Sequence, residues 1–504
     1  MIEYISPDEV DNMLVAYDIY KLVVEKDNFL MQFTHCDIPV LNLGLPSLTS
    51  PLASSNQTPR ITFQTNQSKQ TIGIATINPA FRRDKHTFYS YHNEVPLTYT
   101  IANKLVPPNG QTELVAIMSY GYNQEDSLVV NQTSMARFQF KTIEYSYFKI
   151  TCEANEKFGF VQNSFKLQQQ YTNLNYNKLA PNSYYPSKFT IISKDDVVVA
   201  KYVNDGGSLR NTSFVYNGFE DIVVDDITTG TTTDGYAFCK IRYYSKRYVS
   251  VGDKFSSRHG QKGVVSISLH HTMLPFTSSG SQPDKILSPL ALPTRMTIGQ
   301  LKEGLCGKLC AITGEFIDCT VFEEPNITEI GDKLESYGKD RWGREYMYSG
   351  LTGHWIDNPI AMTETYYQRL PKNAITEIFA ASSDTRKSLI TRQPLDGKAN
   401  LGGLRFGEME KDVSIATGAE YFTMEKMRDD SDGTYAYICG HCKKLMTVNK
   451  KKNKYKCNYC YEKKNPECYE VYMAWTALSL LRHVECSNIG VELTPEVPLL
   501  ELQN

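Results

Sequence analysis

Two Cys-x-x-Cys pairs near the C-terminus place the strongest constraint on what this chain can fold into. Cys439 and Cys442 form the first pair, Cys457 and Cys460 form the second, and 14 residues separate the two pairs. Each pair sets two thiolates on one side of a tight turn, and together they offer the tetrahedral sulfur site that suits Zn²⁺. Because protein would fill all four positions, the spacing predicts a structural zinc site. Two unconnected cysteine pairs are the alternative.

Length and composition narrow the class of protein. A chain of 504 residues corresponds to three or four domains at roughly 100–200 residues each. Its 41% hydrophobic and 22% charged residues are typical of globular proteins and exclude disordered, collagenous and coiled-coil chains. No apolar run reaches the ~18 residues of a membrane span. The acidic N-terminus, which has no long apolar run, predicts no secretory signal.

Charge and cysteine content bear on partners and compartment. The net charge of −3 argues against a simple electrostatic coat for DNA but permits a local basic channel. The 12 cysteines are too sparse for a disulfide scaffold. Four of them are clustered in pairs, which predicts a metal site and a reducing intracellular compartment, either nucleus or cytoplasm.

The hydrophobic pattern predicts mostly strands with a few helices. Ser6, Pro7 and Glu9 form a helix-start signature with a capping box, and apolar residues at 10, 13, 14 and 17 continue it at helical spacing. Two further helices are predicted over 297–312 and 474–486. Alternating or β-branched runs predict strands at 114–118, 128–130, 189–192, 197–203, 222–227 and 237–243, with a turn over 228–235.

The segment from Gly252 to Gly263 carries the densest chemical signal. It holds three glycines and three cations, Lys254, Arg258 and Lys262. Glycines let the backbone approach a ligand closely, and their amides add donors to those of the cations, so this combination suits phosphate oxygens. The segment is not a P-loop. A polar surface loop is the alternative interpretation.

Other polar residues form shorter signals that are individually weaker. Adjacent carboxylates after an apolar strand can support a divalent ion or only shape a turn, and arginines beside glycines suit contacts with a nucleic-acid backbone. These candidates are Arg60, Lys69, Gln70, Glu125, Asp126, Arg295, Arg392 and Arg405. Between the cysteine pairs lies a basic strip, either a nucleic-acid or partner contact or a solvated hairpin tip.

Taken in order, these segments resemble the second-largest (β-type) subunit of multisubunit DNA-directed RNA polymerases, in the eukaryotic, archaeal and large-DNA-virus branch. The resemblance spans almost the whole chain but only the C-terminal half of such a subunit. Either the subunit is encoded as two polypeptides, with the N-terminal half as a separate chain, or this sequence is one piece of it. The sequence departs from the family pattern at 371–386 and 399–401. The carrying segments are 56–60, 69–70, 121–127, 252–263, 293–297, 366–370, 391–394, 402–410 and the four cysteines.

The resemblance implies a β-rich, mixed α/β, multidomain fold. It predicts a double-psi β-barrel hybrid-binding core, an inserted β wall (flap) domain and a C-terminal zinc-ribbon clamp. The implied boundaries are 1–44 for a remnant of the external region, 45–141 and 249–370 for the two parts of the hybrid-binding domain, 142–248 for the wall, 371–412 for the anchor or switch region, and 413–504 for the clamp.

The resemblance also implies catalysis within a complex. Two metal ions align the reacting groups, and the family's carboxylate motif Asn-Ala-Asp-Phe-Asp-Gly-Asp, which belongs to the largest subunit, is absent here. Mg²⁺ would therefore be held mainly by the largest subunit, and this chain would be inactive alone. The expected partners are the largest subunit, the N-terminal half, other polymerase subunits, template DNA, RNA and nucleoside triphosphates, with no membrane.

By the same resemblance, the candidate residues take specific roles. Lys254 and Lys262 would face the RNA end and the nucleotide phosphates, and Arg60 and Arg295 would clamp the triphosphate. Lys69 and Gln70 would lie near the RNA 3′ end. Glu125 and Asp126 would support the second metal. Arg392 and Arg405 would line the hybrid or switch region.

Two other functions compete with this interpretation. A zinc-ribbon accessory protein without catalysis should have lost part of the phosphate-binding set, yet Arg60, Lys254, Lys262 and Arg295 are all present. A stand-alone polymerase or nuclease needs its own carboxylate cluster, and the sequence offers only the Glu125-Asp126 pair.

Overall fold

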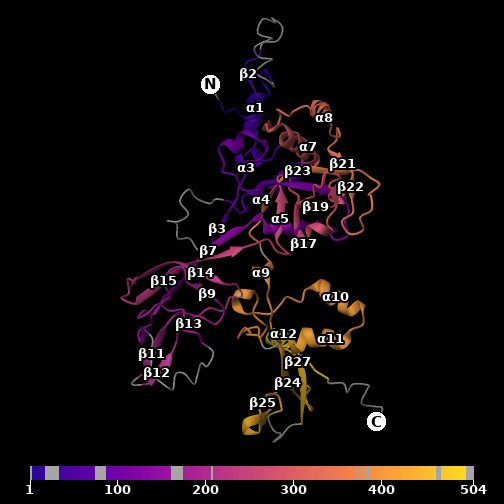
Figure 1. The fold of residues 1–504 in the computed structure, drawn as a ribbon. Coiled ribbons are helices and arrows are strands. Elements are labelled where there is room, and N and C mark those ends of the chain that lie inside the picture. The colour runs from indigo at the N-terminus through magenta and orange to yellow at the C-terminus, as the bar shows by residue number, and fades with distance from the viewer. Residues whose placement is uncertain are drawn as a thin grey trace. The chain divides into compact units, whose positions relative to one another are not determined.

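The chain folds into two compact units, residues 1–377 and 378–504, which are described separately (Figure 1). The computed structural model describes residues 3–16, 33–73, 87–159, 174–205, 208–218, 220–372, 374–381, 385–460 and 467–494. In these residues no helix is both long and apolar enough to cross a membrane.

The centre of the first unit is a sheet that closes on itself. Its strand order is β16-β17-β6-β19-β5-β23-β21, and β16 also pairs with β23, so every strand except β21 belongs to a closed ring. The β17–β6 and β19–β5 pairs are parallel and the others are antiparallel. The sequence prediction of strands near 114–118 and 128–130 is confirmed. The strands are β5 (Gln111–Ile117), β6 (Ser127–Asn131), β16 (Lys254–Ser257), β17 (Lys262–Leu269), β19 (Lys285–Leu287), β21 (Arg344–Glu345) and β23 (Ile360–Arg369).

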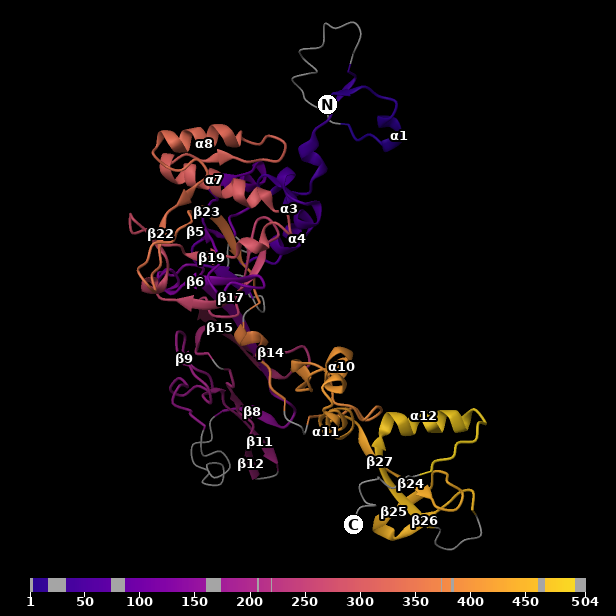
Figure 2. The ribbon, with the colours of Figure 1, turned by 90° about the vertical axis from the view of Figure 1, so that its right-hand side faces the viewer.

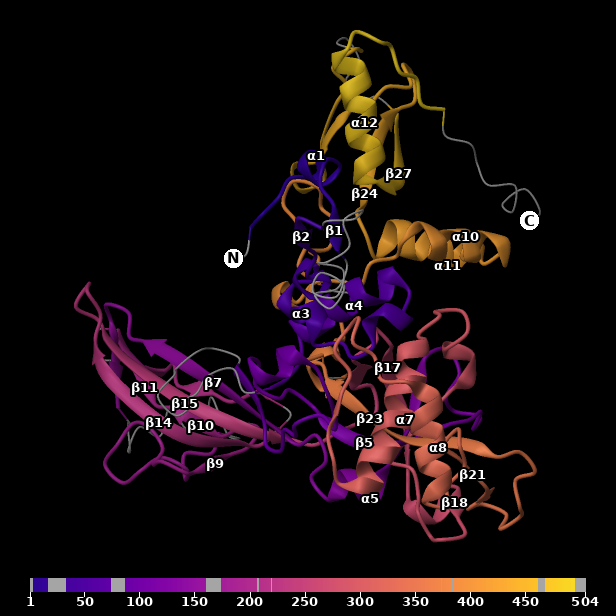
Figure 3. The ribbon, with the colours of Figure 1, turned by 90° about the horizontal axis from the view of Figure 1, so that it is seen from above.

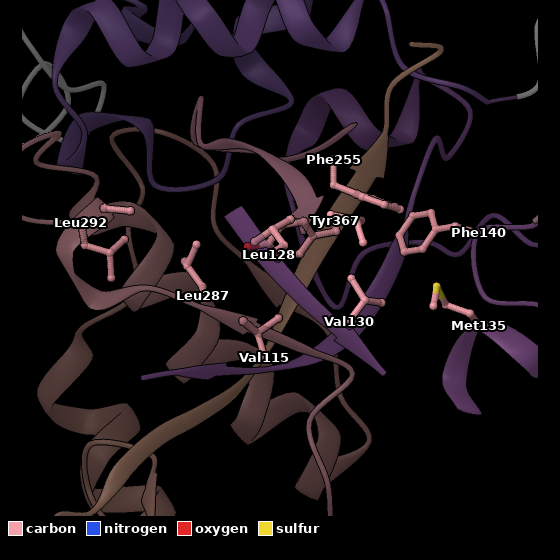
Figure 4. Close-up of a cluster of buried hydrophobic side chains, with 11 residues drawn as sticks. Val115, Leu128, Val130, Met135, Phe140, Phe255, Leu287, Leu292 and Tyr367 are labelled. Carbon is pink, nitrogen blue, oxygen red and sulfur yellow. The ribbon is translucent and has the colours of Figure 1, made fainter. Parts of the chain in front are cut away.

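Apolar side chains from these strands form a common core. Val115, Leu128, Val130, Phe255 and Tyr367 are buried in one cluster and lie near one another between the strands (Figure 4). Removing this apolar surface from water is the main force that holds the ring together. The closed arrangement also leaves no free backbone edge on the strands of the ring.

The core also contains an ion pair. Glu113 on β5 accepts a hydrogen bond from Lys285 on β19, and both side chains are buried. The Lys285 ammonium lies 4.0 Å from the centre of the Phe255 ring. Burial raises the pKa of Glu113 to about 7, against the opposing effect of Lys285.

Helices cover the ring (Figure 2). The helix α7 (Ile298–Thr313) follows Thr297, as predicted from the sequence, and the Lys308 ammonium donates to the Met362 carbonyl oxygen of β23 at 3.2 Å. Leu305 and Leu309 of α7 are buried in a cluster that also contains Leu334 of α8. The other helices of this unit are α1 (Pro7–Val10), α3 (Leu45–Leu48), α4 (Thr58–Ser68), α5 (Gln132–Ala136), α8 (Ile327–Ser336) and α9 (Ala374–Glu377).

Four strands from the chain between β6 and β16 pair with the earlier strand β3 in a second, antiparallel sheet of order β3-β7-β15-β14-β9 (Figure 3). Its core contains Val198, Val199, Val224 and Ile241. The predicted strand regions are confirmed, but the turn is shorter than 228–235, because β14 and β15 stay paired up to Thr231, where β-branched threonines favour extended backbone. The strands are β3 (Thr87–Ser90), β7 (Thr142–Thr151), β9 (Ile191–Ile192), β14 (Ile222–Thr231) and β15 (Ala237–Arg247), with β8 (Glu156–Phe158), β10 (Val197–Val199), β11 (Lys201–Asp205), β12 (Ser208–Asn211) and β13 (Phe214–Val215) in two smaller sheets.

The N-terminal helix is shorter than the sequence pattern predicts. The Ser6–Glu9 capping box forms, but α1 ends at Val10. Val15 and Ala16 instead form β1, which pairs in parallel with β2 (His35–Cys36). The predicted helical position at Tyr17 lies outside the described residues. Pairing with a distant segment has overridden a local helical pattern here. The remaining short strands of this unit are β4 (Thr98–Tyr99), β18 (Phe276–Thr277), β20 (Ile317–Asp318) and β22 (Met347–Tyr348).

The second unit is a small mixed domain. A two-stranded antiparallel sheet, β24 with β27, leads into the predicted helix α12, which follows Ala474. A separate hairpin, β25 with β26, lies between the cysteine pairs in sequence. The elements are α10 (Glu408–Ala416), α11 (Glu420–Met424), α12 (Trp475–Cys486), β24 (Gly433–Cys439), β25 (Thr447–Asn449), β26 (Lys454–Lys456) and β27 (Cys468–Ala474).

Candidate functional site

A buried polar network fixes the loop between β16 and β17. Arg258 donates to Glu303 Oε1 at 2.5 Å and to Thr98 Oγ1 at 2.6 Å, while His259 bonds to the other Glu303 oxygen through Nε2. The second ring nitrogen of His259 lies 2.9 Å from the Asn56 amide nitrogen. Arg258 therefore faces inward, and only two of the three cations in this segment, Lys254 and Lys262, are available to a ligand.

Glu303 is the charged centre of this network. Burial alone would raise its pKa, but the positive charge of Arg258 and the hydrogen bonds with His259 and Arg258 outweigh burial and lower the pKa to about 2. The carboxylate is therefore ionised across the physiological range. The pair joins the β16–β17 loop to α7 through Arg258 Nη2, while Arg258 Nε and Nη1 are buried without a hydrogen-bond partner among the described residues.

Two glycines of the loop allow close backbone contact. Gly260 has a φ of +71°, and a Cβ there would lie 2.4 Å from the Arg60 carbonyl oxygen of α4. A Cβ at Gly263 would lie 2.7 Å from the Asp126 carbonyl oxygen. These positions need glycine because the loop packs directly on the α4 backbone and on the segment before β6.

Lys254 and Lys262 lie on one face of the β16–β17 hairpin. Lys254 pairs with Val264 and Ser256 pairs with Lys262, so the two lysines are diagonal neighbours on the same side. Lys254 is half-buried and Lys262 is exposed. Neither lysine makes an ion pair with any residue that the structure describes. The hairpin therefore presents two uncompensated positive charges from a rigid base.

Arg295 links three segments beside this hairpin. Its guanidinium donates to Gln261 Oε1 at 2.6 Å and to the Asp126 carboxylate. Gln261 in turn donates to Thr297 Oγ1 at 2.7 Å, at the start of α7. The arginine is thereby held between the β16–β17 loop, the segment before β6, and the turn before α7.

Arg60 joins this group electrostatically. Partial burial lowers its pKa first, the positive charge of Arg295 lowers it further, and Asp126 acts in the opposite direction. The Nε atom of Arg60 is buried and has no hydrogen-bond partner among the described residues. Asp126 contacts Arg295 and only influences Arg60 electrostatically, so one carboxylate stands against two guanidinium groups and leaves net positive charge, which favours an anionic ligand. Arg60, Arg295, Lys254 and Lys262 are hereafter called the cation set.

Glu125 and Asp126 occupy a strained turn. Both residues have left-handed backbones, with φ of 51° and 67°, a conformation that costs about 1–3 kcal/mol in a non-glycine residue. Asp126 is engaged by Arg295, whereas Glu125 is exposed. In the described part of the chain the only group of three or more potential metal ligands is the cysteine cluster. Glu125 and Asp126 therefore belong to no such group among the described residues.

Lys69 and Gln70 are separate from the cation set. Lys69 follows α4 nine positions after Arg60, which corresponds to about 14 Å along the axis and the opposite helix face. Both side chains are exposed. The buried side of α4 carries Gln64, which donates to Gln368 on β23 at 3.3 Å, and Gln67, which accepts from Ser256 on β16.

Arg369 is a buried ionic residue that the sequence did not single out for a role. It donates to Asp253 at 2.8 Å and to the Phe140 carbonyl oxygen at 2.6 Å, and so ties the end of β23 to the segments flanking β7 and β16. Glu303 was missed in the same way. No local sequence signal marks either residue, because β23 also carries Glu364 and α7 also carries Lys302 and Lys308.

The four cysteines converge in the second unit. The Sγ atoms of Cys439, Cys442, Cys457 and Cys460 all lie within 4.8 Å of one another. A tetrahedral site with Zn–S bonds of about 2.3 Å requires sulfurs about 3.8 Å apart, so the donor set fits a structural zinc ion. Cys439 and Cys457 are buried with Met446, and the cluster forms the small core of this hairpin region.

Arg392 and Arg405 also lie in the second unit. The guanidinium of Arg392 stacks 3.7 Å from the Trp475 ring centre and lies 3.5 Å from Thr434 Oγ1. One face of Arg392 is thus used for internal packing. Arg405 is exposed and contacts no partner among the described residues.

Comparisons with known proteins identify the family of this chain. The family described as RNA polymerase Rpb2, domain 6, matches residues 47–400, and RNA polymerase Rpb2, domain 7, matches residues 402–494. The chain is 36% identical over 502 residues to the DNA-directed RNA polymerase II subunit RPB2 of Encephalitozoon cuniculi, covering 95% of this chain and 43% of that protein. It is 34% identical over 509 residues to the DNA-directed RNA polymerase II subunit 2 of Arabidopsis thaliana, covering 96% of this chain and 42% of that protein.

A viral relative is equally similar. The DNA-directed RNA polymerase subunit 2 of Acanthamoeba polyphaga mimivirus is 33% identical over 503 residues, covering 91% of this chain and 42% of that protein. The fold and these matches together define the class as a subunit of multisubunit RNA polymerases. Within that class, the chain belongs to the second-largest-subunit (Rpb2) family. It spans less than half the length of these relatives.

Proposed function

We propose that this chain forms one side of the active centre of a DNA-directed RNA polymerase and helps to synthesise RNA on a DNA template. The observation that carries the proposal is the cation set. Lys254 and Lys262 lie on one face of a hairpin whose loop is anchored by a buried network. Arg60 and Arg295 lie beside that loop, where Arg295 contacts the Asp126 carboxylate and Arg60 lies within its electrostatic range.

The chemistry of phosphoryl transfer explains why such a set matters. Negative charge is spread over phosphate oxygens in the transition state, and catalysis is mostly positioning and charge neutralisation. In our proposal the two lysines act as point charges toward the RNA end and the nucleotide phosphates. The two arginines grip the triphosphate, since a planar guanidinium can bind phosphate oxygens in pairs. The anchored loop lets these charges act without reorganising.

Mg²⁺ would be held mainly by the largest subunit. When bound, it activates the RNA 3′-hydroxyl and neutralises the phosphates. The Glu125 carboxylate makes no ion pair with the described residues, and the Asp126 carboxylate contacts Arg295, so we assign both residues to support of the second metal.

The remaining candidates receive roles at the periphery. Lys69 and Gln70, exposed after α4, would contact RNA near its 3′ end. Arg405 and the unstacked edge of Arg392 would contact the hybrid or the switch region.

The proposed domains follow the same assignment. The closed ring is proposed as the double-psi barrel of the hybrid-binding domain, built from 45–141 and 249–370. The antiparallel sheet of 142–248 would be the wall. Residues 1–44 would be the external remnant, 371–412 the anchor, and 413–504 the clamp with its zinc ribbon. Partners would be the largest subunit, other polymerase subunits, DNA, RNA and nucleoside triphosphates, in a reducing compartment of nucleus or cytoplasm.

The test is extension of RNA by the assembled enzyme carrying Lys254→Ala or Lys262→Ala. Loss of one preorganised donor is expected to slow the single-turnover rate by about 10²–10³-fold, with little change in template binding, because many backbone contacts share that affinity. Lys→Arg should rescue only in part, since its shape and reach differ.

The control is Lys333→Ala, which removes an exposed lysine from α8 and should leave the rate unchanged. The pure chain with Mg²⁺ alone should incorporate no nucleotide. Wild-type extension by both lysine variants would remove the catalytic assignment and leave the chain as a zinc-ribbon accessory protein. Incorporation by the pure chain would instead indicate a stand-alone polymerase.

A further inference from the structure

The hairpin between the two cysteine pairs carries an unusual concentration of positive charge. Seven lysines occur between Cys442 and Cys457, and no acidic residue occurs from Gly433 to Tyr461. This contrasts with the net charge of −3 for the whole chain. We call residues 447–456, which include five of these lysines, the lysine hairpin.

The lysine hairpin has a defined shape. β25 and β26 pair in register, with Thr447 opposite Lys456 and Asn449 opposite Lys454. A single 3₁₀ turn over 450–452 connects the strands, and the Asn449 side chain caps it by accepting from the Lys452 backbone amide at 3.1 Å. Asn453 then completes the turn with a left-handed backbone, φ 49°. These lysines are therefore displayed on an ordered scaffold.

The pleat of the hairpin directs two lysines away from the cysteine cluster. Val448 and its cross-strand partner Tyr455 share one face, and Val448 packs against the cluster. Successive side chains of a strand alternate between faces. Lys454 and Lys456 therefore lie on the outward face, and both are exposed.

Most of this charge has no internal partner. Lys450 pairs with Glu470, with nitrogen–oxygen distances of 2.6 and 2.8 Å. Lys451, Lys452, Lys454 and Lys456 make no ion pair with the described residues. Like charges held this close repel one another, and a bound polyanion relieves that repulsion while releasing its own counterions.

Two tyrosines favour a nucleic acid over an acidic protein. Tyr455 is 36% exposed on the face that it shares with Val448, and Tyr459 is 51% exposed with the Lys444 ammonium 4.2 Å from its ring centre. Exposed aromatic rings next to cations stack on unpaired bases of any sequence. Lysine, by contrast, is depleted in protein–protein interfaces.

We propose that the lysine hairpin binds a single strand of nucleic acid through its phosphate backbone, without reading sequence. Nothing on its surface distinguishes ribose from deoxyribose, so single-stranded RNA and DNA should bind alike. The contact is distinct from the cation set and does not depend on catalysis. Its function would be to hold a strand while chemistry proceeds elsewhere.

The test compares full-length chains in equilibrium binding. The variant K451Q/K452Q/K454Q/K456Q removes four unpaired charges, and the control K157Q/K194Q/K246Q/K333Q removes four exposed lysines from the first unit. Fluorescence anisotropy with labelled oligo(U) and oligo(dT) is measured from about 50 to 200 mM salt. In the hairpin variant, the slope of the logarithm of the binding constant against the logarithm of salt concentration should fall in magnitude by about 0.7 for each lost phosphate contact, or up to about 3 in all. The control variant should keep the wild-type slope.

Several outcomes decide the proposal. Equal slopes for the two variants, with zinc retained in both, would overturn it. Polyglutamate that displaces the oligonucleotides from wild type and binds it more tightly than they do would assign the hairpin to an acidic protein instead. The cation set is intact in both variants, so this test fails or succeeds independently of the RNA-extension test.

Discussion

Replacing Glu303 by glutamine should destabilise the first unit strongly. Glu303 and Arg258 are each 1% exposed, so the substitution leaves a buried guanidinium without its counter-charge. Removing one partner of such a pair costs about 3–5 kcal/mol. The pKa of Glu303 gives a similar figure. It lies near 2 against an ordinary 4.5, a difference of about 2.5 units, or about 3 kcal/mol at 1.36 kcal/mol per unit.

The lowered pKa of Glu303 should also make the stability of the first unit depend on pH. A carboxyl group whose pKa is lowered by folding contributes its full stability above its unfolded pKa of about 4.5, and this contribution is lost as pH falls towards 2. The wild-type chain should lose about 3 kcal/mol from this group in that window. Glu303→Gln cannot titrate there, so its own acid-dependent loss should be smaller by that amount.

Chemical denaturation can measure the loss of stability and its pH dependence in the first unit alone. Of the three tryptophans, Trp342 and Trp355 lie in the first unit and Trp475 in the second. A Trp475→Phe background therefore restricts tryptophan fluorescence to the first unit. The free energy of unfolding is then compared between pH 7 and pH 2, so that the whole titration window is covered.

A double variant supplies the control. R258M/E303M removes both charges and fills similar volume with apolar atoms, so it should be more stable than Glu303→Gln alone. A free energy of unfolding for Glu303→Gln within about 1 kcal/mol of wild type at pH 7 would contradict the prediction, because loss of a buried charged partner should cost several times more. The prediction fails equally if the double variant is no more stable than the single one.

Two other expectations concern metal and backbone. Cys439→Ser should abolish the binding of one zinc ion per chain, measured by metal analysis. It should also unfold residues 430–470, measured by hydrogen exchange, because structural zinc supplies the folding energy of so small a core. Retained zinc or unchanged protection from exchange would contradict this prediction. Gly260→Ala should destabilise the first unit more than Gly280→Ala. Both glycines have left-handed backbones, but a Cβ at Gly260 would lie 2.4 Å from a carbonyl oxygen and one at Gly280 would meet nothing within 4 Å. The control measures the backbone cost alone, about 1–2 kcal/mol, and equal losses in a denaturation assay would show that the close contact does not matter.

Features encoded in a continuous stretch of sequence could be predicted. The helix α7 was predictable because leucines at 301, 305 and 309 share one face after Thr297. The cysteine cluster was predictable because each Cys-x-x-Cys turn is local. In both cases the spacing of a few neighbouring residues determines the geometry.

Features that depend on distant contacts could not be predicted in the same way. The pairing of β16 with β23 closes the ring, yet the sequence of neither strand indicates which strand it will pair with. The inward direction of Arg258 depends on Glu303 in a helix 45 residues later. The short α1 reflects pairing of Val15 with His35, which a local helical pattern cannot report. Packing between distant segments determines which strands pair and in which register. It also determines whether a cationic side chain points into the core or toward solvent.

The order of strands in the ring has a consequence for biosynthesis. β5 and β6 leave the ribosome before the antiparallel sheet of β7, β14 and β15, whereas β16, β17, β19 and β23 follow it. The antiparallel sheet can therefore complete its pairing while two ring strands still expose Val115, Leu128 and Val130 to water. Exposed apolar strands of this kind are prone to aggregate during translation. Nascent chains arrested before residue 360 should consequently bind chaperones, and release should coincide with emergence of β23.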